Sequence, residues 1–164
     1  MHLQDLLTEL VKSELFSDSQ AHGSAKIDEL KEVTIMCFAA LTEKSEGARG
    51  DLVQNSEVVL ALVEVLSSEA QLTTLQLAAF DLLRSIGRAR LAKKRILREL
   101  FTEKKLNFVD RVSKQFLMAC ERASTVDKTS ADHKLALQMR LMTLRVINNF
   151  GVDFKQFISK DRLL

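Results

Sequence analysis

The 164-residue chain contains no proline, tryptophan or tyrosine, and it has only five glycines and two cysteines. Proline and glycine are the residues that most strongly disfavour helix interiors, so their scarcity leaves long stretches open to helix formation. Leu, Ala, Glu, Lys, Arg and Gln dominate instead, and these residues lose little rotamer freedom in helices. No stretch alternates strand-forming and polar residues convincingly. The sequence therefore predicts an all-α fold and a single domain over residues 1–164.

The same scarcity excludes several classes of protein. Cys37 and Cys120 lie in apolar helical runs, which favours small buried side chains over a disulfide framework. No uncharged run reaches the roughly 18 residues of a membrane span, and no basic-then-apolar leader opens the chain. We therefore expect a protein of the cytoplasm, the nucleus or both.

Motifs for catalysis and for metal binding are also missing from the sequence. There is no glycine-rich phosphate loop, nucleophile elbow or zinc signature. His2, His22 and His133 are scattered, without a second histidine or cysteine at ligand spacing. We expect no catalytic residues, no metal site and no cofactor, and hence a protein that is not an enzyme.

Apolar residues at three- and four-residue spacing predict a series of amphipathic helices. Their apolar positions span residues 3–15, 27–41, 58–66, 75–86, 91–101, 106–117 and 135–150, with a short closing helix at 154–158. The helix at 27–41 is apolar over much of its circumference and is predicted to be central; that at 135–150 is predicted to be buried. Polar loops are expected at 17–24, 43–50 and 124–132, with one short helical turn around Leu52 and Val53.

Glycines and capping residues predict where these helices begin and end. Gly47 and Gly50 are expected to interrupt helix formation, whereas Gly87 and Gly151 are expected to end the helices before them. Asn55 or Ser56, and Thr73 or Thr74, are the expected N-caps of the helices that follow them.

The predicted helices repeat as a unit three times along the chain. The first helix of each copy reads LLTELVKSELFSD from Leu6, VVLALVEVLSSEA from Val58 and LNFVDRVSKQFLM from Leu106. A more hydrophobic helix follows each: KIDELKEVTIMCFAALTE, LTTLQLAAFDLLRSIG and KLALQMRLMTLRVINNFG. A short segment closes each copy: ARGDLV, AKKRIL and DFKQFI.

This pattern resembles the armadillo repeat family. The resemblance is carried by FAALTEKSEGARGDLVQNSEVVLALVEVLSS, at Phe38–Ser68, and by LRVINNFGVDFKQFI, at Leu144–Ile158. It implies a right-handed, armadillo-like helical-repeat stack of about three repeats whose third helices line a concave groove. The sequence lacks the family's proline, and the groove asparagine occurs only as Asn149, with Ser85 and Ala40 at the matching positions. HEAT-like repeats are therefore the alternative.

The resemblance implies a binding groove around Asn149, whose amide both donates and accepts hydrogen bonds. Arg145 lies one turn earlier, and Ser85 and Asp81 occupy the equivalent surface of the middle repeat. Alternatively, the Asn149 amide caps the carbonyls beside Gly151 or forms a hydrogen bond between helices.

Charge is unevenly distributed along the chain, although the formal net charge is only +2. Residues 1–83 carry 5 basic and 14 acidic side chains, a net of −9, whereas residues 84–114 carry 11 and 3, a net of +8. We call the centre of this positive block the basic ridge: Arg84, Arg88, Lys93, Lys94, Arg95 and Arg98. It is read as a solvated helix face, as a docking surface for an acidic protein segment, or as a contact for nucleic acid or anionic membrane.

Together these features predict an interaction domain that binds a peptide segment of a partner protein through the groove or the basic ridge. The alternatives are a nucleic-acid-binding repeat that uses residues 84–105, and an architectural or dimerisation domain. Against nucleic acid, only Phe101 and Phe108 lie among the basic residues, whereas single-strand binding usually needs aromatic stacking platforms. The apolar residues at both chain ends are compatible with self-association. They are also compatible with the chain being a fragment of a longer protein.

Overall fold

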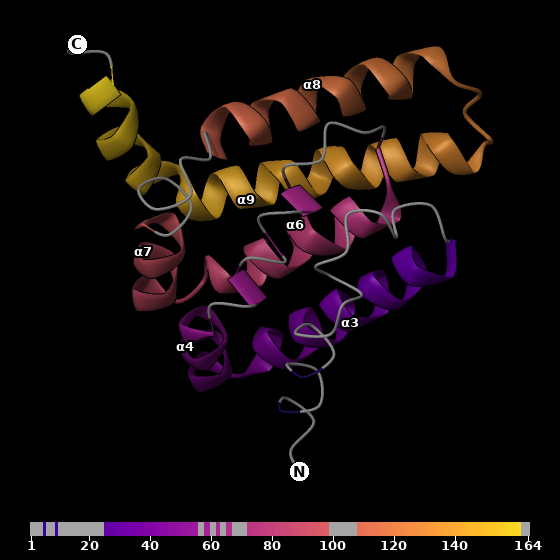
Figure 1. Ribbon diagram of the computed structural model, residues 1–164. Coiled ribbons are helices and arrows are strands. Elements are labelled where there is room, and N and C mark those ends of the chain that lie inside the picture. The colour runs from indigo at the N-terminus through magenta and orange to yellow at the C-terminus, as the bar shows by residue number, and fades with distance from the viewer. Residues whose placement is uncertain are drawn as a thin grey trace.

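A computed structural model of the chain describes residues 5, 9, 25–55, 58–59, 62, 65–66, 72–98 and 108–161. In this part of the chain the structure consists of helices and contains no strand (Figure 1). The bounded helices are α3 (Ala25–Lys44), α4 (Glu46–Gln54), α6 (Thr74–Ile86), α7 (Arg90–Arg98), α8 (Phe108–Thr125) and α9 (Ala131–Asp161). The all-α prediction is confirmed. The predicted helix at 3–15 and loop at 17–24 lie outside the described residues, except that Asp5 and Glu9 are helical.

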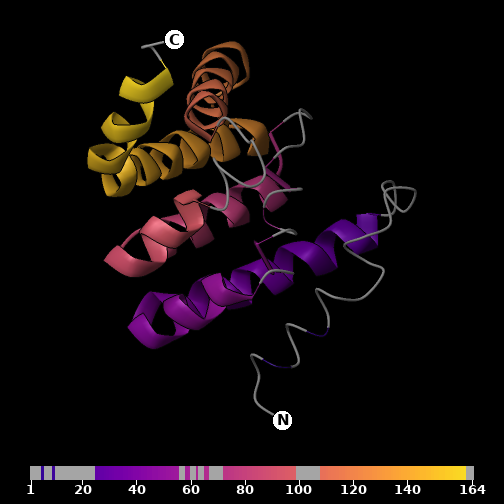
Figure 2. The same ribbon diagram turned by 60° about the vertical axis from the view of Figure 1, so that its left-hand side comes forward.

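Three long helices, α3, α6 and α9, lie side by side in that order (Figures 1 and 2). α3 packs against α6, α6 packs against α9, and α8 packs along α9. The short helices α4 and α7 contact each other at one end of this layer, on the left in Figure 1. The second helices of the three predicted copies are therefore neighbours in space.

The core between these helices is aromatic and aliphatic. Phe38 from α3, Phe80 from α6 and Phe150 from α9 are among the largest fully buried side chains. Burying each of them contributes about 1.5 to 3 kcal/mol relative to leaving it in water. Ala79 and Ala119 are also completely buried, and their small side chains allow neighbouring helices to approach closely.

N-caps place the starts of three described helices. Thr73 Oγ1 accepts a hydrogen bond from the Gln76 N–H at 3.1 Å, and Asn55 Oδ1 accepts one from the Val58 N–H at 3.3 Å. Both caps are among those predicted. Ser45 Oγ accepts a hydrogen bond from the Ala48 N–H at 3.1 Å and starts α4.

Two of the predicted helix breaks are wrong. Gly47 and Gly50 lie inside α4, and α9 continues through Gly151 to Asp161 rather than giving way to a separate closing helix. A glycine costs a helix interior only about 1 kcal/mol, which neighbouring helical residues outweigh. α9 nevertheless changes direction towards its C-terminal end (Figures 1 and 2).

Gly87 ends α6 as predicted. It does not, however, adopt the left-handed backbone conformation for which glycine is usually required at a helix end. Its φ is −63° and its ψ is −11°, which any residue can adopt. A Cβ atom at this position would lie 2.5 Å from Cε2 of Phe150 and 3.1 Å from Cβ of Asn149. Glycine is therefore needed here because α9 passes so close to the end of α6.

Several apolar residues predicted to face the core are exposed instead. Leu91 of α7 is 83% exposed, whereas Ala92 and Ile96 of the same helix are buried. The helices predicted to be central and buried, α3 and α9, expose Leu30, Val33 and Met36 on α3 and Leu137, Leu141 and Leu144 on α9. Cys37 and Cys120 are only partly buried. Periodicity locates apolar stripes, but it does not show which of two stripes meets a partner helix.

Candidate binding site

An open hollow of about 610 Å³ lies where α3, α6 and α9 meet, near the C-terminal ends of α3 and α6. We call it the arginine hollow. It is lined by Glu43, Arg84, Arg88, Leu144, Arg145, Asn148 and Asn149. The structure therefore brings together two predicted groove residues and two residues of the basic ridge.

Glu43 of α3 holds two of these arginines. Its Oε2 lies 2.9 Å from Nη2 of Arg84, and its Oε1 accepts a hydrogen bond from Nη1 of Arg88. Arg84 also donates from Nε to Oδ1 of Asp81 at 2.7 Å. The two ion pairs of Glu43 join the end of α3 to α6 and to the turn after it, across residues that are more than forty positions apart in the sequence.

The charges of this cluster stabilise one another. Desolvation acts to raise the pKa of Glu43, but the hydrogen bonds and charges of Arg84, and then of Arg88, outweigh it and lower that pKa below its ordinary value. Desolvation likewise acts to lower the pKa of Arg84, but the hydrogen bonds that Arg84 donates to Asp81 and Glu43, together with the charges of these carboxylates, outweigh it and raise that pKa. Glu43 and Arg84 are therefore both charged at neutral pH.

Asn149 forms the back wall of the hollow. Its Nδ2 donates a hydrogen bond to the Arg84 carbonyl at 2.9 Å, which ties α9 to the end of α6. The main-chain carbonyl of Asn149 accepts a hydrogen bond from Nζ of Lys93 at 3.0 Å, and this bond adds α7 to the same junction. Asn149 therefore makes a hydrogen bond between helices, which was one of its alternative readings, and its role in binding a partner stays a prediction.

Ser85 does not belong to this surface, contrary to the sequence-based expectation. It is completely buried on the core side of α6, next to Ile86. Asp81 is half-buried, and its carboxylate is paired with Arg84. Arg145 is exposed on α9, and the structure gives it no hydrogen bond or ion pair with any described residue.

The basic ridge is not one continuous surface. Arg84 and Arg88 face the arginine hollow, and Lys93 lies at the junction with α9. Lys94 and Arg95 are exposed on α7 and do not line the hollow, and the Arg98 side chain lies outside the described residues. The turn at Gly87 separates α6 from α7, so residues that are close in sequence point to different surfaces.

Glu43 was missed from the sequence because it lies in a segment predicted to be a loop. The repeat pattern did carry a signal. Ala40 and Ser85 occupy matching positions, so Glu43 and Arg88, three residues later, match as well. Opposite charges at matching positions of adjacent copies indicate an ion pair between neighbouring helices.

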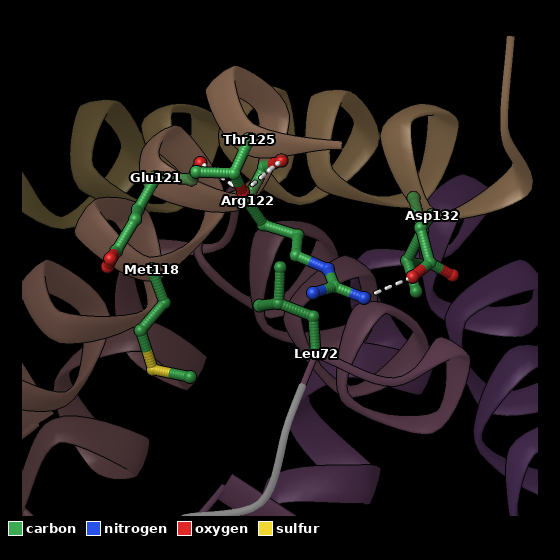
Figure 3. Close-up of a pocket in the computed structure, with 7 residues that line it drawn as sticks. Leu72, Met118, Glu121, Arg122, Thr125 and Asp132 are labelled. Carbon is green, nitrogen blue, oxygen red and sulfur yellow. Dashed lines mark hydrogen bonds and ion pairs between the residues drawn. The ribbon is translucent and has the colours of Figure 1, made fainter. Parts of the chain in front are cut away.

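A second hollow, of about 290 Å³, lies between the end of α8 and the start of α9 (Figure 3). Figure 3 shows the Arg122 guanidinium pointing across it to the Asp132 carboxylate, with which it forms an ion pair. Leu72 and Met118 supply apolar walls, and the Thr125 hydroxyl donates to the Glu121 carbonyl at 3.1 Å. Its main charges pair with each other, so it offers less to a ligand than the arginine hollow does.

Comparison of the chain with protein-family models, with curated proteins and with solved structures gives no match. The armadillo-like resemblance thus rests on the repeat pattern alone. Among the described residues, no group of three or more His, Cys, Asp or Glu side chains is placed to hold a metal ion. None of the described helices combines the length and apolar character that a membrane crossing requires.

Proposed function

We propose that this chain is a non-enzymatic protein-interaction domain that binds a peptide segment of a partner protein across α3, α6 and α9. The observation that carries the proposal is the arginine hollow, which is lined by two exposed cationic side chains, Arg88 just after α6 and Arg145 on α9, and by an exposed leucine, Leu144. Arginine forks bind carboxylates well, and exposed apolar side chains next to them provide contact area.

We further propose that the three long helices line the groove of a right-handed armadillo-like stack of about three repeats, with a HEAT-like stack as the alternative. The alternation of long and short helices supports this: α3 leads into α4, and α6 leads into α7. The change of direction in α9 supplies the corresponding feature in the third copy (Figure 1). Successive helices of such stacks form extended binding surfaces.

Apolar side chains extend the proposed surface beyond the arginines. Met36 is exposed and lies seven residues, or two helical turns, before Glu43, so both share one face of α3. Leu141 is exposed one turn before Arg145 on α9. A peptide that crosses these helices therefore meets apolar side chains first and cationic side chains at the hollow.

Selection of peptides tests this proposal directly. The purified chain is used to select from a random peptide library displayed on phage, and the affinity of enriched peptides is then measured by fluorescence polarisation. Leu144→Gln is expected to weaken binding, whereas Leu117→Gln on α8 is the matched control, since Leu117 is 64% exposed and does not line the hollow. If no peptide enriches, or if the two variants weaken binding equally, the proposal is contradicted.

The nucleic-acid alternative is favoured by one observation, the exposure of Arg90, Lys94 and Arg95 on α7. Binding through these residues should weaken steeply as salt is raised, because neutralising phosphates releases counterions. Lys94→Glu together with Arg95→Glu should abolish nucleic-acid binding while leaving peptide binding at the hollow unchanged.

The dimerisation alternative predicts a mass that rises with protein concentration in sedimentation experiments without added ligand.

A further inference from the structure

The arginine hollow carries a small net positive charge. Three arginines belong to it, Arg84, Arg88 and Arg145, and two carboxylates are bonded to them, those of Glu43 and Asp81. Three cations against two anions leave a net charge of +1. Lys93, whose Nζ donates to the Asn149 main-chain carbonyl at 3.0 Å, adds a further positive charge beside this cluster, so the hollow attracts an anionic ligand group.

The donors that remain for a ligand come from two of the three arginines. The Arg84 side chain is 14% exposed and already donates to both Asp81 and Glu43. The Arg88 side chain is 45% exposed and makes one ion pair through Nη1, which leaves the other edge of its guanidinium open. Arg145 is exposed and makes no hydrogen bond or ion pair with any described residue, and the Asn148 amide beside it is exposed as well.

We infer that the arginine hollow binds a single carboxylate of an acidic peptide between Arg88 and Arg145. This inference rests on the proposed peptide-binding function and names the group that the peptide must supply. A carboxylate presents two oxygens, which match the parallel donors of a guanidinium fork.

The walls of the hollow also constrain the residue next to this carboxylate. Leu144 lines the hollow and is 47% exposed, and Leu141 continues the exposed stripe one turn earlier on α9. An apolar residue adjacent to the carboxylate covers these leucines. Two sources supply that chemistry: an Asp or Glu side chain beside an apolar residue, and the C-terminal carboxylate of a peptide that ends in an apolar residue.

The experiment uses the full chain and one peptide enriched in the library selection. The peptide is made in three forms: with its acidic residue, with the matching amide residue, and with its C-terminus amidated. Dissociation constants are measured for the wild-type chain, Arg145→Gln, Arg88→Gln and the control Arg95→Gln. Arg95 is an exposed arginine outside the hollow, so it reports the general effect of removing one positive charge.

Arg145→Gln is expected to weaken binding of the carboxylate form about tenfold, in line with the loss of a charge-assisted hydrogen bond, and to leave the form without the carboxylate nearly unchanged. Arg95→Gln changes binding less than about twofold, as expected for a distant exposed charge. If the change from the acidic to the amide residue removes the dependence on Arg145, the carboxylate comes from a side chain. If C-terminal amidation removes it, the carboxylate is the C-terminus of the peptide.

The possible failures are distinct. If no peptide enriches, the proposed function itself fails. If peptides enrich and respond to Leu144→Gln, but bind equally well without any carboxylate or with Arg145→Gln, the function stands and the carboxylate inference is overturned.

Discussion

The close approach of α9 to Gly87 makes a sharp prediction about stability. Replacing Gly87 with alanine adds a Cβ atom 2.5 Å from Cε2 and 3.1 Å from Cδ2 of the Phe150 ring. Phe150 is completely buried, so its ring cannot swing away into solvent. The backbone itself accepts alanine, since Gly87 has a φ of −63°. The effect of the substitution therefore depends on packing and not on backbone strain.

Two opposing contributions set the size of this effect. At a position with favourable backbone angles, Gly→Ala stabilises a protein by about 0.4 to 1 kcal/mol, because it restricts the unfolded chain. Overpacking a tight core costs about 1 to 3 kcal/mol. We expect the packing cost to win, so that Gly87→Ala lowers the free energy of unfolding by about 1 to 2 kcal/mol. For a chain of this length that corresponds to a decrease in Tm of about 3 to 6 °C.

Urea unfolding followed by circular dichroism measures the effect, and Gly50→Ala is the matched control. Gly50 lies inside α4, and nothing lies within 4 Å of a Cβ atom there, so this change should stabilise the chain by about 0.5 to 1 kcal/mol. Combining Gly87→Ala with Phe150→Leu should reduce the cost of Gly87→Ala by at least about 0.5 kcal/mol, since the two sites contact each other. If Gly87→Ala stabilises the chain, or if its cost is the same with leucine at position 150, the packing argument is wrong.

Three further predictions concern the cluster around the hollow and the neighbouring helix. Folding lowers the pKa of Glu43, so the unfolded state binds a proton at this carboxylate more tightly than the folded state does. The contribution of Glu43 to stability is therefore complete above the ordinary glutamate pKa of 4.5 and is lost as the pH falls below that value. Glu43→Gln should remove this part of the acid dependence of stability in urea unfolding. Asn149→Ala should cost about 1 kcal/mol in thermal unfolding through loss of its hydrogen bond to the Arg84 carbonyl, and a neutral result would contradict that bond. Leu91→Gln should change the unfolding free energy by less than about 0.5 kcal/mol, whereas Ile96→Ala on the same helix should cost about 2 to 5 kcal/mol.

The parts of the fold that sequence predicted well are those with local causes. Asn55 and Thr73 cap helices because their side-chain oxygens reach N–H groups three residues later, an interaction that needs no distant partner. These two helix starts were therefore predictable from short stretches, whereas the start of α4 at Ser45 lay in a predicted loop. The helix ends were less readable: Gly47 and Gly151 continue helices, since the cost of one glycine is smaller than the gain from packing the helix around it.

The site was predictable in its cations and not in its geometry. The density of basic residues identified Arg84 and Arg88, and the repeat pattern identified Arg145. Whether a helical residue faces the core or the surface depends on how neighbouring helices are rotated and shifted, which one sequence does not specify. For that reason Ser85 was placed on the surface although it is buried, and Glu43 was overlooked although both its carboxylate oxygens bond arginines.

The residues of the arginine hollow divide into those that hold the helices together and those that are open to a ligand. Asn149 and Lys93 form hydrogen bonds between helices, and Arg84 is largely buried in ion pairs, so the back of the hollow is fixed by contacts that also stabilise the fold. Arg145 and Leu144 are exposed, and the described contacts that stabilise the fold do not include Arg145. Substituting Asn149 should therefore change stability and binding together. Substituting Arg145 should change binding alone, and this difference makes Arg145 the better test of what the hollow recognises.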